Sequence, residues 1–318
     1  MDTTSPPTPA VSVENLVKRY GSFVAVDHLS LSIRPGEVFG LLGPNGSGKT
    51  TTIDCILQLL TYDKGRIELF GEPMTPTSYG LKRRVGVVPQ NIAVFDELTV
   101  RENIDFFCGL YVTDRAERAR RVDTAVDFCG LGEFASWRPR KLSGGLLRRL
   151  NIACGIAHRP DLAFFDEPTV AVDAQSRAQI LSGIRSMNEA GTTVVYTSHY
   201  MEEVEELCSR VAILDHGRII AQGTVDELKA QVKIGETVSV ELANLPAGLL
   251  ERIEALPGCR EASYGDGTLQ VRCANRPHNL LDVLGAVRDC HGTPGRVWSE
   301  PPTLNDVFLE LTGRKLRD

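Results

Sequence analysis

The pattern of apolar and polar positions divides the chain into two regions with different orders of secondary structure. Residues 1–10 carry three prolines and three threonines and almost nothing apolar, which predicts a disordered lead-in. Apolar runs separated by turn residues then predict antiparallel strands at 11–16, 23–26 and 29–33. The run Val38–Leu42 is apolar throughout, as is typical of a strand buried on both faces. A glycine-rich loop at 43–48 and a helix from Lys49 to about Leu60 follow it.

Helical periodicity dominates from residue 98 to about 158, and Asp114 is positioned to cap a helix that runs to Leu131. Strands with buried character return at 162–165, 193–196 and 211–214. Strands that alternate with helices favour a mostly parallel α/β sheet. Residues 11–225 are therefore predicted to form an α/β domain with an antiparallel β subdomain and a helical subdomain at about 98–158.

The second region has a different order of elements. After a linker at 226–236, residues 237–318 are predicted to form a small α+β domain in the β-α-β-β-α-β order, which is the ferredoxin-like order. A closing helix begins after Thr303, a predicted N-cap with Asp306 at N3, and ends at Gly313. Its single apolar stripe must be covered, either by its own chain, which we favour, or by a second subunit.

Composition narrows the class of protein. The chain has 318 residues, of which 42% are hydrophobic and 24% charged, and its net charge is −6. These values are typical of a soluble globular protein, and the negative balance argues against nonspecific nucleic-acid binding. Eight cysteines without a CxxC pair indicate reduced thiols in an intracellular protein. We find no apolar run long enough to cross a bilayer and no signal peptide.

The loop after the buried strand carries the first chemical signal. Its residues match the pattern G-x-x-x-x-G-K-[ST] in full and are Gly43, Pro44, Asn45, Gly46, Ser47, Gly48, Lys49 and Thr50, with Thr51 next. Glycines let backbone N–H groups turn toward phosphate, and the helix N-terminus adds a positive dipole. Lys49 is predicted to reach the β- and γ-phosphates of ATP, and the Thr50 hydroxyl to ligate Mg²⁺.

Two adjacent carboxylates follow the strand at 162–165. Asp166 and Glu167 stand at the C-terminal end of this strand, where open α/β sheets bind ligands. Alone they would be explained as a solvated acidic loop. With a phosphate-binding loop present, Asp166 is predicted to hold Mg²⁺ and Glu167 to polarise the attacking water.

The stretch Ser143, Gly144 and Gly145 opens a helix, and an N-cap at Ser143 would explain it by itself. Its place before Glu167 makes the chain resemble the ATP-binding-cassette (ABC) ATPases. The resemblance covers residues 11–223 and implies roles for four further residues. Tyr20 would stack on adenine, Gln90 would lie near Mg²⁺ and the transmembrane partner, Asp173 would be the D-loop aspartate, and His199 would contact the γ-phosphate as the switch histidine.

Two residues depart from the family's motifs. Leu146 stands where the signature usually has glutamine, and the D-loop reads Ala171-Val172-Asp173 where Gly-Leu-Asp is usual. Neither change removes a phosphate ligand, so the expectation of ATPase activity stands. Coupling between subunits or the turnover rate is where these changes would act.

The resemblance implies an ATP-hydrolysing subunit at the cytoplasmic face of a membrane. Two copies would close head to tail, with Ser143, Gly144, Gly145 and Asp173 of one acting on the ATP of the other, and a separate permease would form the pore. The segment 302–314 resembles the tail of cassettes that serve ABC-2-type exporters of drugs and lipids. An importer ATPase and a soluble ABC protein acting on ribosomes or DNA are the alternatives. One P-loop and no heptad run disfavour the last of these.

Overall fold

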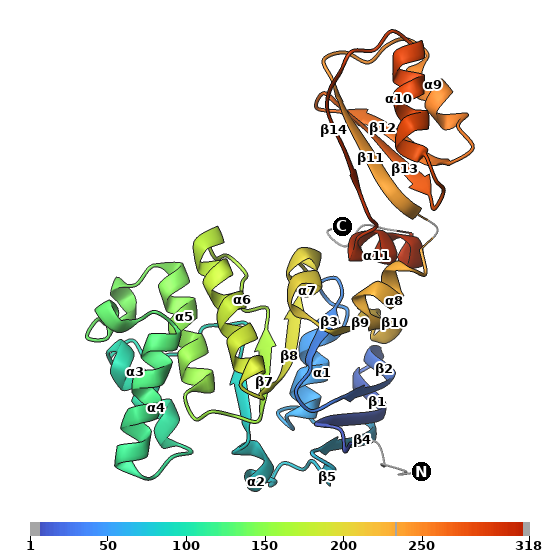
Figure 1. Ribbon diagram of the computed structural model, residues 1–318. Helices are drawn as coiled ribbons and strands as arrows, with labels where there is room; N and C mark the ends of the chain where they lie inside the picture. Colours follow the sequence, from blue (N-terminus) through green and yellow to red (C-terminus); the bar gives the residue numbers. More distant parts are fainter. Residues whose placement is uncertain (1–6, 233, 314–318) are drawn as a thin grey trace, which may run out of the picture. The chain divides into compact units, whose positions relative to one another are not determined.

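The computed structural model describes residues 7–232 and 234–313, and the chain splits into two compact units whose boundary lies between Val225 and Asp226 (Figure 1). Each unit has its own buried apolar cluster.

The core of the first unit is a six-stranded sheet. Its order is β10 (Arg218–Thr224), β9 (Arg210–Asp215), β3 (Val38–Leu42), β8 (Thr193–Ser198), β7 (Leu162–Asp166) and β6 (Val85–Val88). Only β10 runs antiparallel to its neighbour, so the prediction of a mostly parallel sheet is confirmed. Every residue of β3 and β7 is buried, because helices cover both faces of the sheet (Figure 1).

A second, antiparallel sheet packs beside the core sheet. It contains β1 (Val11–Tyr20), β2 (Phe23–Ile33), β4 (Lys64–Leu69) and β5 (Glu72–Pro73). Helix α1 (Lys49–Ile56) contributes Ile53 and Ile56 to an apolar cluster that also contains residues of both sheets. The two sheets and α1 therefore share one core.

Two predictions at the edges of this region are wrong in their bounds. The lead-in includes Ala10, which is fully buried, donates its N–H to Ile33 O (2.8 Å) and accepts from Phe70 N (3.0 Å). Residues 1–6 lie outside the described part of the chain. Helix α1 ends at Ile56 rather than near Leu60, because Gln58 adopts a left-handed φ of 56° and the amides of Leu59 and Leu60 both turn back to Asp54 O.

The helical subdomain, green in Figure 1, consists of three α-helices and two short 3₁₀ turns. They are α3 (Val100–Gly109), α4 (Arg115–Phe128), η1 (Gly132–Phe134), η2 (Pro139–Lys141) and α5 (Gly144–Ile156). The predicted caps of Asp114 and Ser143 are confirmed, since each side chain accepts an N–H from the third residue of its helix. Helix α4 stops at Phe128 rather than Leu131, because Gly130 turns left-handed with a φ of 59°.

The remaining helices of the first unit are α2 (Tyr79–Lys82), α6 (Ala174–Glu189) and α7 (Met201–Leu207). Helix α6 packs against β8, and α7 packs against β3 and β8. In the described residues no helix of either unit combines the length and apolar character needed to span a bilayer.

The second unit has the predicted order of elements. They are β11 (Ile234–Leu242), α9 (Leu249–Glu254), β12 (Cys259–Gly265), β13 (Thr268–Ala274), α10 (Asn279–Asp289) and β14 (Pro294–Glu300), after a short helix α8 (Val225–Lys229). The sheet is antiparallel in the order β12-β13-β11-β14. The linker predicted at 226–236 is wrong, because α8 and the start of β11 occupy most of it and Leu228 is fully buried.

The closing helix α11 (Leu304–Thr312) begins with the predicted capping box of Thr303 and Asp306 and ends at left-handed Gly313. Leu304, Val307 and Phe308 are buried within the single chain, whereas Leu311 is 46% exposed. Asp306 Oδ1 lies 3.3 Å from Arg272 Nη2 of β13, which ties the helix to its own sheet. Three of these four apolar residues are thus covered without a second subunit, and Leu311 is not.

The cysteines are free, and most are core residues. Cys55, Cys108, Cys129, Cys154, Cys208 and Cys273 are buried, and only Cys259 and Cys290 are partly exposed. Burial raises the pKa of Cys55 and Cys273 to about 11 and that of Cys129 to about 12.

Candidate active site

The loop between β3 and α1 forms a cradle of backbone amides. Gly48, the N-cap of α1, has a φ of 104° and offers no side chain to the helix, so the first N–H groups of α1 stay open to a ligand. A Cβ at Gly48 would lie 2.6 Å from Ala25 O, and therefore only glycine fits. An open helix N-terminus of this kind suits phosphate.

Lys49 is buried at the base of this cradle. Its Nζ donates to Gly43 O (2.7 Å) and Pro44 O (3.1 Å) and lies 3.6 Å from Glu167 Oε1. Burial lowers the pKa of Lys49, although the nearby carboxylates of Glu167 and Asp166 oppose that shift. A buried cation in such a loop is well placed to meet a polyanion.

Ser47 gives an independent sign that the cradle fits an anion. Its Oγ is buried and has no hydrogen-bond partner within the described structure. A buried hydroxyl without a partner is costly, and a phosphate oxygen in the cradle would accept its proton.

Oxygen ligands for a magnesium ion gather next to the cradle. Asp166 accepts from Thr50 Oγ1 (2.8 Å) through Oδ2 and from Thr197 Oγ1 (2.6 Å) through Oδ1. Gln90 Nε2 donates to Glu167 Oε2 (3.0 Å), which brings its amide to the same side. Hydroxyl, amide and carboxylate oxygens are the donors that Mg²⁺ prefers, together with water and phosphate. The residues present therefore fit the ion.

Glu167 occupies the centre of the site. It has a left-handed φ of 47°, and its N–H donates to Thr197 Oγ1 (2.9 Å). His199 Nδ1 lies 3.6 Å from Glu167 Oε1 and is itself buried without a hydrogen-bond partner in the part of the chain described. A carboxylate held this way, beside a histidine and a lysine, can orient a water molecule and accept its proton.

One cavity of about 550 Å³ joins these residues. Its lining residues are Tyr20, Phe23, Ala25, Asn45, Gly46, Gly48, Lys49, Thr50, Thr51, Gln90, Glu167, Val170 and His199. Tyr20 is 49% exposed, so its ring is available for a planar base. The sequence-predicted residues that converge on this one cavity are Tyr20, Asn45, Gly46, Gly48, Lys49, Thr50, Thr51, Gln90, Glu167 and His199.

Eight of the sequence-predicted residues do not line this cavity. Gly43, Pro44, Ser47 and Asp166 belong to the loop and the strand end whose other residues line it, whereas the remaining four stand at the starts of α5 and α6. Ser143 and Gly144 are exposed at the start of α5, and Asp173 is exposed at the start of α6. Gly145 is buried, and a Cβ there would lie 2.5 Å from Ser176 Oγ and 2.9 Å from Asp173 Oδ2. The two loops are therefore neighbours. Ala171 adopts a φ of 59°, a conformation that suits the glycine usual in the family.

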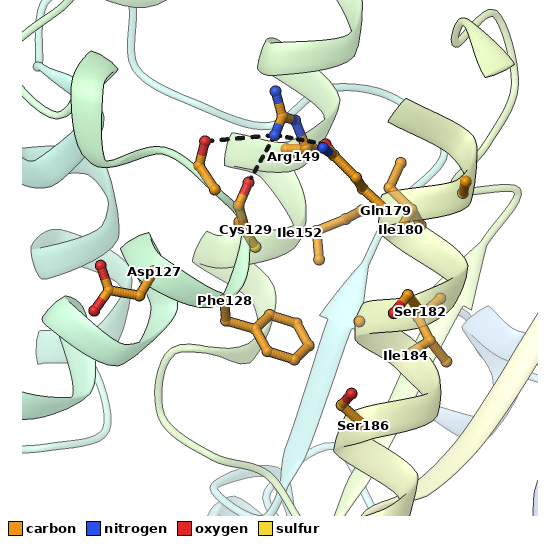
Figure 2. Close-up of a pocket in the computed structure, with 13 residues that line it drawn as sticks. Asp127, Phe128, Cys129, Arg149, Ile152, Gln179, Ile180, Ser182, Ile184 and Ser186 are labelled. Atoms are coloured by element: carbon orange, nitrogen blue, oxygen red, sulfur yellow. Dashed lines mark hydrogen bonds between the residues drawn. The ribbon is translucent and has the colours of Figure 1, made fainter. Parts of the chain in front are cut away.

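Helices α5 and α6 meet again one turn later. Figure 2 shows Arg149 above a cavity of about 480 Å³, where its Nη1 donates to Gln179 Oε1 (2.8 Å) and to Cys129 O (3.2 Å). The ring of Phe128 points into this cavity (Figure 2). The contacts at Gly145 and Arg149 hold the helices that begin at Ser143 and Asp173 to each other.

Sequence reasoning missed three residues that support the site. Thr197 bonds both Asp166 and Glu167, Arg148 Nη1 donates to Gln90 O (2.7 Å), and Asn151 Oδ1 accepts from Ala93 N (2.9 Å). Arg148 and Asn151 are three residues apart on one buried face of α5. Polar residues on an otherwise apolar face were the signal available for them.

Comparison with known proteins agrees with this geometry. Residues 26–170 match the family described as ABC transporter. The chain is 36% identical to the linearmycin resistance ATP-binding protein of Bacillus subtilis over 97% of its own length and 100% of that protein. The chain belongs to the ABC transporter family. This ABC protein is also 39% identical to a Nod factor export ATP-binding protein of Ralstonia nicotianae, over 98% of its length and 96% of the relative.

Solved structures show the same fold. A dimeric ATP-binding cassette in a post-hydrolysis state with ADP and Pi matches 67% of the ABC protein and 98% of that cassette, with a TM-score of 0.62 and 26% identity. The ABC protein is accordingly an ATPase of the cassette type, as the sequence predicted.

Proposed function

We propose that the protein is the ATP-hydrolysing subunit of an ABC exporter that moves a drug- or lipid-like substrate through a separate permease. The observation that carries the proposal is the convergence of Lys49, Glu167 and His199 on one cavity beside an open helix N-terminus. These groups are the ones that ATP hydrolysis requires. The printed names of the relatives, linearmycin resistance and Nod factor export, support export of such a cargo over import.

The residues divide the work of hydrolysis. Lys49, Ser47 and the amides of the loop hold the phosphates, and Tyr20 holds the base. Thr50, Asp166 and Gln90 would hold Mg²⁺, which supplies charge neutralisation on the phosphate oxygens. Glu167 orients the attacking water and takes up its proton, and His199 lies beside it to contact the γ-phosphate.

Ser143, Gly144, Gly145 and Asp173 act on the nucleotide of a second copy in a head-to-tail dimer. Ser143, Gly144 and Asp173 are exposed and lie outside the cavity of their own chain, which supports a role in trans. Donors aimed at the γ-phosphate across the interface would stabilise the charge of the transition state.

An exposed aromatic patch supports docking of a permease at the cytoplasmic face of the membrane. The patch consists of Phe95 and Phe106, which are each more than 40% exposed and whose ring centroids are 4.9 Å apart. Phe95 lies five residues after Gln90, so the patch adjoins the cavity in sequence. Apolar surface of this kind marks a protein contact.

We further assign residues 11–225 to the ATPase domain and the C-terminal residues from 237 to an accessory domain. The separate apolar clusters of the two units support this division. The net charge of −6 supports a partner other than nucleic acid.

Glu167→Gln tests the proposal. The substitution removes only the base, so we expect unchanged ATP affinity and a loss of turnover of roughly 10²–10⁴-fold. Trapped ATP should also hold two copies together. Steady-state phosphate release and size exclusion with Mg-ATP measure the two effects.

Glu68→Gln on β4, a carboxylate outside the cavity, is the matched control and should hydrolyse ATP as the unaltered protein does. Turnover of Glu167→Gln within tenfold of the unaltered protein would remove Glu167 from the role of base.

A further inference from the structure

Helix α7 carries four glutamates, and one of them is inside the protein. Glu203 is 3% exposed, whereas Glu202 and Glu206 are exposed. Burying a carboxylate costs free energy unless hydrogen-bond donors surround it. The groups around Glu203 therefore indicate its role.

Three hydroxyl groups donate to the same oxygen of this carboxylate. Glu203 Oε2 accepts from Thr169 Oγ1 (2.7 Å), Tyr196 OH (2.7 Å) and Ser198 Oγ (3.0 Å). Burial and the nearby negative charge of Glu203 raise the pKa of Tyr196 well above its usual value, so its hydroxyl remains a donor.

The other oxygen faces a cation. Glu203 Oε1 lies 3.2 Å from Arg177 Nε of α6, and the Arg177 guanidinium lies 4.9 Å from the ring centroid of Tyr200. One side chain therefore joins β8, the loop after β7, and α6.

Each of these partners adjoins a residue of the site. Thr169 follows Glu167 by two residues, Ser198 immediately precedes His199, and Arg177 lies one turn of α6 beyond Asp173. Ser198 Oγ also accepts from Tyr200 N (2.9 Å), which fixes the backbone on both sides of His199.

We propose that Glu203 is a positioning residue for hydrolysis, because its buried carboxylate holds the segments that carry Glu167, His199 and Asp173 at fixed separations. The inference rests on the function proposed above. A requirement for stability alone would be met as well by an apolar side chain, since replacing a buried ion pair with apolar groups is often neutral. The three hydroxyls converge on one oxygen because their segments must keep one arrangement.

Glu203→Ala and Glu203→Gln test this inference in the full chain. Alanine frees all three hydroxyls, and we expect kcat for ATP to fall on the order of tenfold to a hundredfold while KM changes less than about threefold. Glutamine can keep its oxygen on the hydroxyls and loses only the pair with Arg177, so it should recover most of kcat. Glu202→Gln, the same change at an exposed position of α7, is the control.

Thermal unfolding of each variant sets an assay temperature at which all are folded, and bound ATP analogue counts the competent sites. Coupling supplies a second readout. Because Glu203 acts in part through the segment that carries His199, Glu203→Ala added to His199→Ala should lower kcat less than it does alone.

The inference is overturned if Glu203→Ala lowers only the unfolding temperature and keeps kcat per competent site, or if its effect multiplies in full with that of His199→Ala. The Glu167→Gln experiment separates this failure from failure of the proposed function. If Glu167→Gln loses hydrolysis while Glu203→Ala keeps full kcat, the proposed function stands and only the positioning role of Glu203 is overturned.

Discussion

Lys49 is a cation held inside the protein by two carbonyl oxygens and the carboxylates of the site. Bound phosphate would supply the full countercharge that these groups supply only in part. Lys49→Ala is therefore expected to weaken ATP binding by about tenfold or more and to abolish hydrolysis. Titration with a fluorescent ATP analogue measures the affinity, and Lys82→Ala, at a partly buried position of α2 outside the cavity, is the control. Unchanged affinity would contradict the role.

His158 is a buried neutral histidine two residues after the end of α5. Its ring stacks on Tyr111 with centroids 4.1 Å apart, and its Nε2 lies 3.1 Å from Val85 O. Burial lowers the pKa of His158 from 6.5 to about 4. Between these two pH values the unfolded chain binds a proton that the folded chain does not. Stability from this group is therefore fully present above pH 6.5 and is lost as the pH falls toward 4.

His158→Gln should remove this loss, which amounts to roughly 3 kcal/mol at most. Urea midpoints of both proteins between pH 4 and pH 7 measure it. We expect the unaltered protein to lose stability more steeply than the variant over that interval, and equal slopes would show that His158 is already protonated when folded.

The residues of the site differ in how far sequence could predict them. Lys49, Thr50 and Asp166 stand in a loop and a strand end whose patterns carry their own mechanism, and the structure brings them together. Thr197 and Arg148 belong to no such pattern, because their hydrogen bonds to the site depend on which segments the fold brings side by side. Glu203 is one of several glutamates in α7, and only the fold distinguishes it from the others.

At Gly155, helix α5 approaches the backbone of β6. A Cβ there would lie 2.5 Å from Val87 O and 2.8 Å from Val88 Cγ2, so Gly155→Ala must push the helix away from the strand. We expect a loss of about 1–3 kcal/mol in the free energy of unfolding. Turnover should fall as well, because Arg148 of the same helix holds Gln90.

Gly285→Ala in α10 is the matched control. A Cβ there meets nothing within 4 Å, and alanine favours a helix interior, so stability should rise by up to about 1 kcal/mol. Urea unfolding of both variants gives the comparison. A Gly155→Ala protein as stable as the unaltered one would mean that α5 and β6 can separate freely.

Elements with strong local signals were predicted well, and their ends were not. The apolar run at 38–42 is β3, and the side chains of Asp114, Ser143 and Thr303 cap the helices expected of them. Helix α1 ended early because Gln58, which is not glycine, turned left-handed. The stretch at 226–236 was predicted as a linker because most of its residues are polar. Leu228, the one buried side chain of α8, is too little to give an apolar pattern.

The two units have separate apolar clusters, and the nucleotide cavity is lined entirely by residues of the first unit. A chain cut after Val225 is therefore expected to fold and to bind ATP within about threefold of the full chain. We expect it to dimerise less well and so to hydrolyse ATP more slowly at low protein concentration. Nucleotide titration and the concentration dependence of specific activity measure both. If the shortened chain matches the full chain in both, the second unit is not a dimerisation element, and we would reassign it to contact with the permease.

The two units differ in whether thiol reagents can reach their cysteines. All five cysteines of the first unit are buried, and the partly exposed Cys259 and Cys290 both belong to the second. A thiol that is buried and slow to ionise reacts poorly with maleimides, alkylating agents and peroxide. The cassette is therefore a natural low-background host for a single reporter cysteine. A reporter cysteine introduced at Ser143 would be the one reactive thiol once Cys259 and Cys290 are replaced, because the other six native cysteines are buried. It would stand at the surface where two copies are expected to meet.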